Sequence, residues 1–155
     1  MEVAVLGDKG FDNKPSIEAK ALRINLNPYI YGTFAEIGAG QEVARHFFRV
    51  GGASGTIAKT ISAYDKNFSD TIYGEEADGR YVTETRLGKM LDHEMTLLEA
   101  RIPKEQRSNK MFFTLANTVA TIDFAKKFMG HGWMGIRFQV TPEEPYSNII
   151  LHVRF

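Results

Sequence analysis

The segment Glu36-Ile37-Gly38-Ala39-Gly40 carries the residue types best suited to binding a ligand. Glycines between a strand and a helix let a ligand approach bare backbone, and the free N–H groups at the start of the helix favour an anion. Glu36 stands at the junction of strand and turn, a position where catalytic acids often occur. We therefore predict a nucleotide or small-molecule site lined by Glu36, Gly38, Gly40 and Gln41.

A second cluster, Gly130-His131-Gly132-Trp133-Met134-Gly135, precedes a predicted strand. The indole ring of Trp133 can stack on a flat ligand, and the imidazole of His131 can exchange protons near neutral pH. We predict these two side chains on the opposite wall of the same site. A hairpin turn with a core tryptophan explains the pattern equally well.

The glycine turn resembles the first half of the cofactor loop of S-adenosylmethionine-dependent methyltransferases, but Glu42 occupies the position of the third glycine. The acidic residue expected after a second strand is also missing, because residues 54–64 are predicted to be helical. A dinucleotide-binding fingerprint would need glycine in place of Val43. The turn therefore predicts either a ligand site or a simple change of chain direction, and we assign no cofactor and no catalytic residue.

Other chemistries find little support in the residues. The chain has no cysteine, and its 4 histidines form neither an H-x-x-H nor an H-E-x-x-H pattern, so we predict no metal site. The formal net charge is zero, with 19 basic and 19 acidic side chains, which argues against a nucleic-acid partner.

The elements that position these residues follow from apolar periodicity. A strand ending near Ala35 leads through the glycine turn into a helix over 41–49, which Gly51 and Gly52 stop. Ser54 is predicted to cap a second helix over 54–64, and 65–79 to form a surface loop. A continuous apolar stripe predicts a long helix over 83–102.

Strands dominate both ends of the chain in this prediction. The first 20 residues are predicted to form a flexible arm with a short strand over 3–6, followed by a strand over 21–27 in which apolar and polar residues alternate. Further strands are predicted over 111–122, 133–140 and 148–155. Helices in the middle and strands at the end favour an α+β (or α/β) fold, with a mixed or antiparallel sheet and about three helices packed on it.

Length and composition fit a single domain over residues 1–155. The N-terminus lacks the basic leader and apolar run of a signal peptide, and no stretch approaches the ~18 apolar residues of a spanning helix. We expect a cytoplasmic protein with no membrane partner. Because the last predicted strand has no segment after it, we also expect the chain to be the N-terminal part of a longer protein.

Most of the chain resembles an uncharacterised bacterial family. The matching segments are Tyr31–Phe48, Gly55–Asp65, Met90–Glu94, His131–Gln139 and Ile149–Arg154. Beside Thr118 that family carries an aspartate where this chain has Asn117, so we assign no acid role there. The resemblance implies one of two labels that members carry, TonB-dependent receptor or nicotinate-nucleotide adenylyltransferase, the second of which is a nucleotidyltransferase.

The residues support neither label. An outer-membrane receptor needs a signal peptide and many alternating strands. An adenylyltransferase of this kind has a His/Thr-x-Gly-His motif at the end of its first strand, and the nearest segment here, Phe128-Met129-Gly130-His131, lies in the last third of the chain. The alternative to a ligand site is a non-enzymatic scaffold or assembly domain, such as a homo-oligomer, for which 11 phenylalanines and 6 tyrosines supply interface material.

Overall fold

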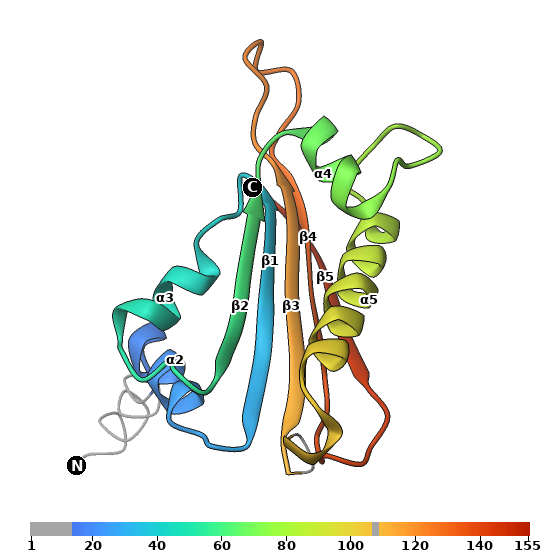
Figure 1. Ribbon diagram of the computed structural model, residues 1–155. Coiled ribbons are helices and arrows are strands. Elements are labelled where there is room, and N and C mark those ends of the chain that lie inside the picture. The colour runs from blue at the N-terminus through green and yellow to red at the C-terminus, as the bar shows by residue number, and fades with distance from the viewer. Residues whose placement is uncertain (1–13, 107–108) are drawn as a thin grey trace, which may run out of the picture.

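The computed structural model describes residues 14–106 and 109–155, and it contains one five-stranded sheet (Figure 1). The strand order is β2-β1-β3-β4-β5. β1 runs parallel to both β2 and β3, whereas β4 pairs antiparallel with both β3 and β5, so the predicted mixed sheet is confirmed. The strands are β1 (Ile30–Gly38), β2 (Ile57–Ala63), β3 (Met111–Ala120), β4 (His131–Phe138) and β5 (Ser147–Arg154).

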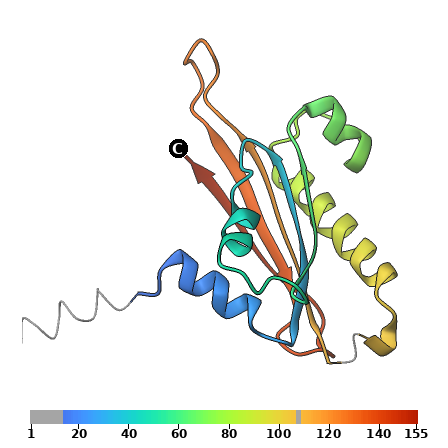
Figure 2. The ribbon, with the colours of Figure 1, turned by 60° about the vertical axis from the view of Figure 1, so that its left-hand side comes forward.

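Four α-helices of the described chain cover the sheet from two sides, one more helix than predicted (Figure 2). α2 (Ile17–Asn25) and α3 (Val43–Arg49) lie on one side, which we call face B. α4 (Lys66–Tyr73) and α5 (Glu84–Arg101) lie on the other side, face A, and a short 3-10 helix, η1 (Lys104–Gln106), follows α5. The result is a layered α/β fold with the main core beneath α5.

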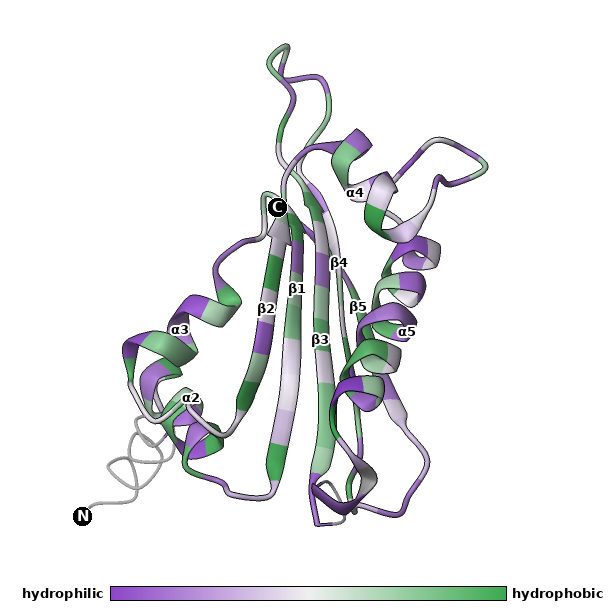
Figure 3. Ribbon diagram, viewed as in Figure 1, coloured by the Kyte–Doolittle hydropathy of each residue, from purple (hydrophilic) through white to green (hydrophobic). Residues whose placement is uncertain are grey.

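The long helix α5 confirms the prediction for 83–102. Thr83 caps it, because its side chain accepts a hydrogen bond from the backbone N–H of Arg86. Its apolar side buries Leu87, Met90 and Leu91 against the small side chains of β1 and β3. Hydrophobic and hydrophilic segments alternate along α5 in Figure 3, as expected for a helix that packs one side on a sheet.

A buried ionic network fastens α4 to α5. The Arg86 guanidinium is fully buried and donates to Asp70 at 2.5 Å, to Glu76 at 3.0 Å and to the carbonyl of Gly74 at 2.7 Å. Hydrogen bonds from Lys66 and Arg86 lower the pKa of Asp70. Burial alone would raise the pKa of Glu76, but hydrogen bonds from Arg86 and Lys89 outweigh it and lower that pKa.

Glu94, on the sheet side of α5, forms a second buried contact. Its carboxylate accepts from the Lys59 ammonium at 2.5 Å and from the Tyr73 hydroxyl at 3.0 Å. Burial and the neighbouring carboxylate raise the pKa of Tyr73 well above its usual range. These groups join α4, α5 and β2, and they are satisfied by one another.

Residues 17–25 form α2, so the strand predicted over 21–27 is wrong, and the arm predicted over residues 1–20 is wrong for residues 17–20. The alternating Leu22 and Leu26 remain 37% and 65% exposed, whereas the buried residues Ala21 and Asn25 follow a helical spacing. Ser16 caps the helix by accepting from Ala19. The strand predicted over 3–6 lies outside the described residues.

Residues 57–63 form the edge strand β2, so the helix predicted over 54–64 is wrong. The spacing of Ile57 and Ile61 fits a helix, but β-branched side chains also suit a strand, and pairing with β1 decides the outcome. The loop predicted over 65–79 is wrong in part, because Asp65 caps α4 by accepting from Phe68.

Candidate functional site

The glycine turn at the end of β1 packs tightly against β3. Gly38 has a φ of 77°, and a Cβ atom there would lie 2.2 Å from the carbonyl oxygen of Val119. A Cβ atom on Gly40 would lie 2.5 Å from the Val119 side chain and 2.8 Å from Asn117 Oδ1. Ala39 N–H donates to the same Val119 carbonyl at 3.0 Å. Gly38 is therefore required by its positive φ and by the close approach of the β3 backbone, and Gly40 by the close approach of two β3 side chains.

Glu36 is buried, at 4% exposure, and holds the start of α3. Its Oε1 accepts from Val43 N–H at 2.9 Å and from the Asn117 side-chain amide at 3.0 Å, and its Oε2 accepts from Ala44 N–H at 3.2 Å. The residue at the N-cap position, Glu42, makes no side-chain capping bond. A carboxylate from the neighbouring strand thus satisfies the free N–H groups of the helix.

Gln41 ties the turn to β2. Its amide donates to the carbonyl of Gly38 at 3.0 Å and to that of Ala63 at 3.4 Å. The structure therefore brings Glu36, Gly38, Gly40 and Gln41 together at the turn. The Glu36 carboxylate and the Gln41 amide form hydrogen bonds with other groups of the chain. The sequence analysis assigned Asn117 no role in the site; the available signal was a polar residue on the side of the strand that otherwise carries Phe113, Leu115 and Val119.

A small open hollow of about 210 Å³ lies beside the turn, between α3 and β2. Within the described residues, the exposed Arg45 has no hydrogen-bond or ion-pair partner there, and the hydroxyls of Thr60 and Ser62 are also exposed. A cation, hydroxyls and an amide suit a small anion. The lining residues are Glu36, Gln41, Ala44, Arg45, Phe48, Thr60, Ile61 and Ser62.

His131 and Trp133 lie at the same end of the sheet but on face A, whereas the turn folds onto face B. The Trp133 ring stacks on His152, with ring centroids 4.4 Å apart and an angle of 8° between the planes. His131 Nδ1 lies 3.0 Å from His152 Nε2. Trp133 also packs against the core under α5, and neither Trp133 nor His131 lines the hollow beside the turn.

The geometry also bears on a methyltransferase cofactor site and on a metal site. Asp65 does follow the second strand, where a methyltransferase carries its acidic residue, but its carboxylate caps α4. Among the described residues no group of three histidine, cysteine or acidic side chains is arranged to hold a metal ion.

Comparisons with known proteins show the fold of the chain. No family model and no curated protein matches the sequence. The competence/damage inducible protein CihA of Agrobacterium tumefaciens is 17% identical, with a TM-score of 0.58, over 89% of this chain and 79% of that one. A competence-damaged (CinA) superfamily protein of Klebsiella pneumoniae is 12% identical, with a TM-score of 0.59, over 90% and 81%. That of Escherichia coli is 11% identical, with a TM-score of 0.59, over 91% and 79%.

At these identities the likeness establishes a shared α/β fold and leaves the activity open. The structure adds one observation on membranes: none of the helices within 14–106 and 109–155 combines the length and apolar character needed to cross a bilayer.

Proposed function

We propose that this chain is an assembly domain whose strand β5 pairs with β5 of a second copy. The observation that carries the proposal is the exposure of β5, in which all eight residues are exposed. Ile149, Leu151 and Val153 point to face B and are 51%, 53% and 38% exposed. No helix of the described chain covers these side chains, so apolar area that folding would normally bury remains open to a partner.

The free edge of β5 lacks the features that usually prevent strands from pairing. It contains neither lysine nor proline, and its pairing with β4 is continuous from Ser147 to Arg154. An edge of this kind offers a row of unpaired backbone groups to another strand. Arg154 is its only charged residue at neutral pH, which favours an uncharged partner over an acidic or basic one.

On face B the apolar row of β5 continues onto β4, where Met134, Ile136 and Phe138 are half-buried, whereas Phe113 and Asn117 on β3 are buried. Face B of β3, β4 and β5 presents no charged side chain, because the register places only apolar, small or uncharged polar residues there. Those positions are Phe113, Leu115, Asn117, Val119, Gly132, Met134, Ile136, Phe138, Ser147, Ile149, Leu151 and Val153.

A second copy fits this edge because β5 is self-complementary. A two-fold axis perpendicular to the sheet keeps face B of one copy beside face B of the other, so the exposed apolar rows become continuous. With the axis at Leu151, Ile149 of one copy faces Val153 of the other, and Arg154 faces Asn148. No two charges of the same sign then meet across the edge.

The expected affinity is moderate. Burying the exposed half of three aliphatic side chains in each copy contributes on the order of 1 kcal/mol per side chain, or about 6 kcal/mol in the dimer. New backbone hydrogen bonds add to this, and the loss of translational and rotational freedom opposes it. These magnitudes correspond to a dissociation constant on the order of micromolar.

Light scattering coupled to size exclusion tests the proposal over a range of protein concentrations spanning micromolar values. We expect a concentration-dependent dimer for the natural chain and a monomer for Leu151→Lys, because two lysines would meet at the two-fold axis. Leu26→Lys, at the exposed C-cap residue of α2 (65% exposed), is the matched control and should dimerise normally. A monomer at every concentration, or a dimer unaffected by Leu151→Lys, overturns the proposal.

The second candidate function is binding of a nucleotide or another small anion in the hollow beside the glycine turn. Exposed Arg45, close to the hydroxyls of Thr60 and Ser62, is the observation that favours it. Shift mapping with AMP, S-adenosylmethionine and inorganic phosphate tests it, with Arg45→Gln as the variant and Arg49→Gln as the control. Saturable shifts around residues 36–45 that Arg45→Gln abolishes would support the site, and silence of those residues would remove it.

A further inference from the structure

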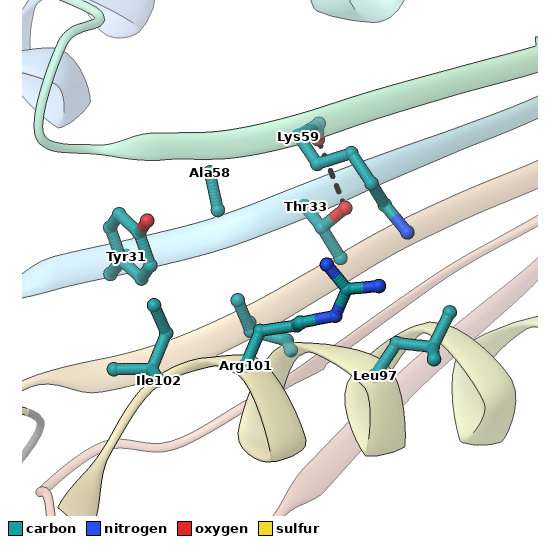
Figure 4. A pocket seen from close by; sticks show the side chains of 8 residues that line it. Tyr31, Thr33, Ala58, Lys59, Leu97, Arg101 and Ile102 are labelled. Atoms are coloured by element: carbon teal, nitrogen blue, oxygen red, sulfur yellow. Dashed lines mark hydrogen bonds between the residues drawn. The ribbon is translucent and has the colours of Figure 1, made fainter.

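A larger hollow, of about 430 Å³, lies on face A at the other end of β1 and β2, next to the last turn of α5 (Figure 4). It is as large as typical small-molecule sites. Its apolar surface comes from Ala58 on β2 and from Leu97, Leu98 and Ile102 at the end of α5. Its polar groups come from Tyr31, Thr33, Lys59 and Arg101.

Two cations from different elements border this hollow. Figure 4 shows Arg101 extending from α5 toward Thr33 and Lys59 on the sheet. Lys59 is paired with the buried Glu94, whereas Arg101 has no hydrogen-bond or ion-pair partner within the described residues. Two positive charges and one negative charge leave one net positive charge at the rim of the hollow.

The hydroxyl groups differ in availability. Thr33 Oγ1 donates to the Lys59 carbonyl at 2.9 Å, so this hydroxyl is already used within the sheet, where it positions the β2 backbone. The Tyr31 ring is half-buried against Phe112, and its hydroxyl has no protein partner among the described residues. Tyr31 therefore offers a hydrogen-bonding group at one end of the hollow, and Arg101 offers a charge at the other (Figure 4).

We propose that this hollow binds a small monoanionic acid with an apolar body. The single net charge selects a monoanion, which Arg101 can hold through two parallel N–H···O bonds. The apolar body would contact Leu97, Leu98 and Ile102. This site is separate from the glycine turn and from β5, and none of its residues was predicted from the sequence to line a site.

A purely structural role for Arg101 makes different predictions. A cation in the last turn of a helix interacts favourably with the negative end of the helix dipole. If this is its only role, replacing Arg101 lowers the melting temperature without affecting any ligand. The helix end also disfavours an anion, so the proposed site depends on the net positive charge that Arg101 and Lys59 leave after the pairing of Lys59 with Glu94.

The test is a nuclear magnetic resonance titration of the full chain with benzoate, with benzyl alcohol as the uncharged analogue and inorganic phosphate as an anion without an apolar body. We expect saturable shifts from benzoate at residues 31–33, 58–59 and 97–102, none from benzyl alcohol, and weaker binding of phosphate. Arg101→Gln should bind benzoate roughly tenfold more weakly or worse, and Arg49→Gln should bind it like the natural chain.

Three results would overturn the proposal: no saturable benzoate shifts in this region, equal binding by Arg101→Gln, or tighter binding of phosphate than of benzoate. The melting temperatures of both variants are measured alongside, so that a folding defect is distinguished from a loss of binding.

Discussion

Replacing Glu36 by alanine should destabilise the protein strongly, because this carboxylate joins three elements. It connects β1 to the first turn of α3 and to Asn117 on β3 through three hydrogen bonds of 2.9 to 3.2 Å. A ligand-binding or catalytic carboxylate would behave in the opposite way, since its removal usually leaves stability unchanged or improved.

The magnitude follows from the groups that lose their acceptor. Asn117 is fully buried and Ala44 is 7% exposed, so the amide of the first and the backbone N–H of the second cannot regain a water partner easily. Each unsatisfied buried donor costs about 1–3 kcal/mol, and loss of a helix cap costs about 1 kcal/mol. We therefore expect Glu36→Ala to lower the free energy of unfolding by roughly 3–5 kcal/mol.

Urea unfolding, followed by the fluorescence of Trp133, the only tryptophan, measures this change. Glu42→Ala is the matched control, because Glu42 stands at the N-cap position without a capping bond and should change stability by less than about 0.5 kcal/mol. If both variants unfold at the same urea concentration, the structural role of Glu36 is refuted and a role in ligand binding becomes the better explanation.

Three more predictions concern the same scaffold. Gly38→Ala should destabilise the protein by more than about 2 kcal/mol, because it combines a positive φ with a clash against a carbonyl. Gly88→Ala, in open space on α5, should instead stabilise it by about 0.5–1 kcal/mol, and thermal unfolding compares the two variants. Asn117→Asp should destabilise at pH 7 and recover in acid, since two carboxylates then face each other until one binds a proton, and equal losses at both pH values would contradict this. Folding lowers the pKa of Asp70 and that of Glu76, so their ionised carboxylates stabilise the fold at pH values above the unfolded pKa values of 3.8 and 4.5. The melting temperature should therefore fall as the pH drops through the folded pKa values, and Arg86→Met should flatten that dependence.

The fold class and half of its elements could be predicted from periodicity alone. The long helix and strands β3 and β4 have apolar patterns that agree with their burial in the sheet and core, and the alternation in β5 predicted a strand although all its residues are exposed. The failures occurred where local pattern and tertiary environment disagree. Leu22 and Leu26 alternate like strand residues, yet the helix buries Ala21 and Asn25, and Asn25 donates to the carbonyls of Phe47 and Gly51. A single sequence does not reveal such a contact between α2 and the end of α3.

The candidate site was only partly predictable for a similar reason. The strand–glycine–helix junction was correctly located, but Glu36, predicted to line a ligand site, is hydrogen-bonded to the start of α3 and to Asn117. Its hydrogen bond with Asn117 depends on β3 lying beside β1, a pairing between residues far apart in the chain. The hollow between Lys59 and Arg101 was not visible either, because β2 had been predicted to be helical.

Hydrogen–deuterium exchange at a low and a high protein concentration tests most directly whether β5 is an assembly edge. Backbone amides in residues 147–154 should become protected as the concentration rises through micromolar values, because their outward N–H groups then bond to the second copy. Strand β2, the opposite edge of the same sheet, is the internal control and should exchange at the same rate in both samples. Equal exchange of β5 at the two concentrations would rule out the pairing of β5 with a second copy.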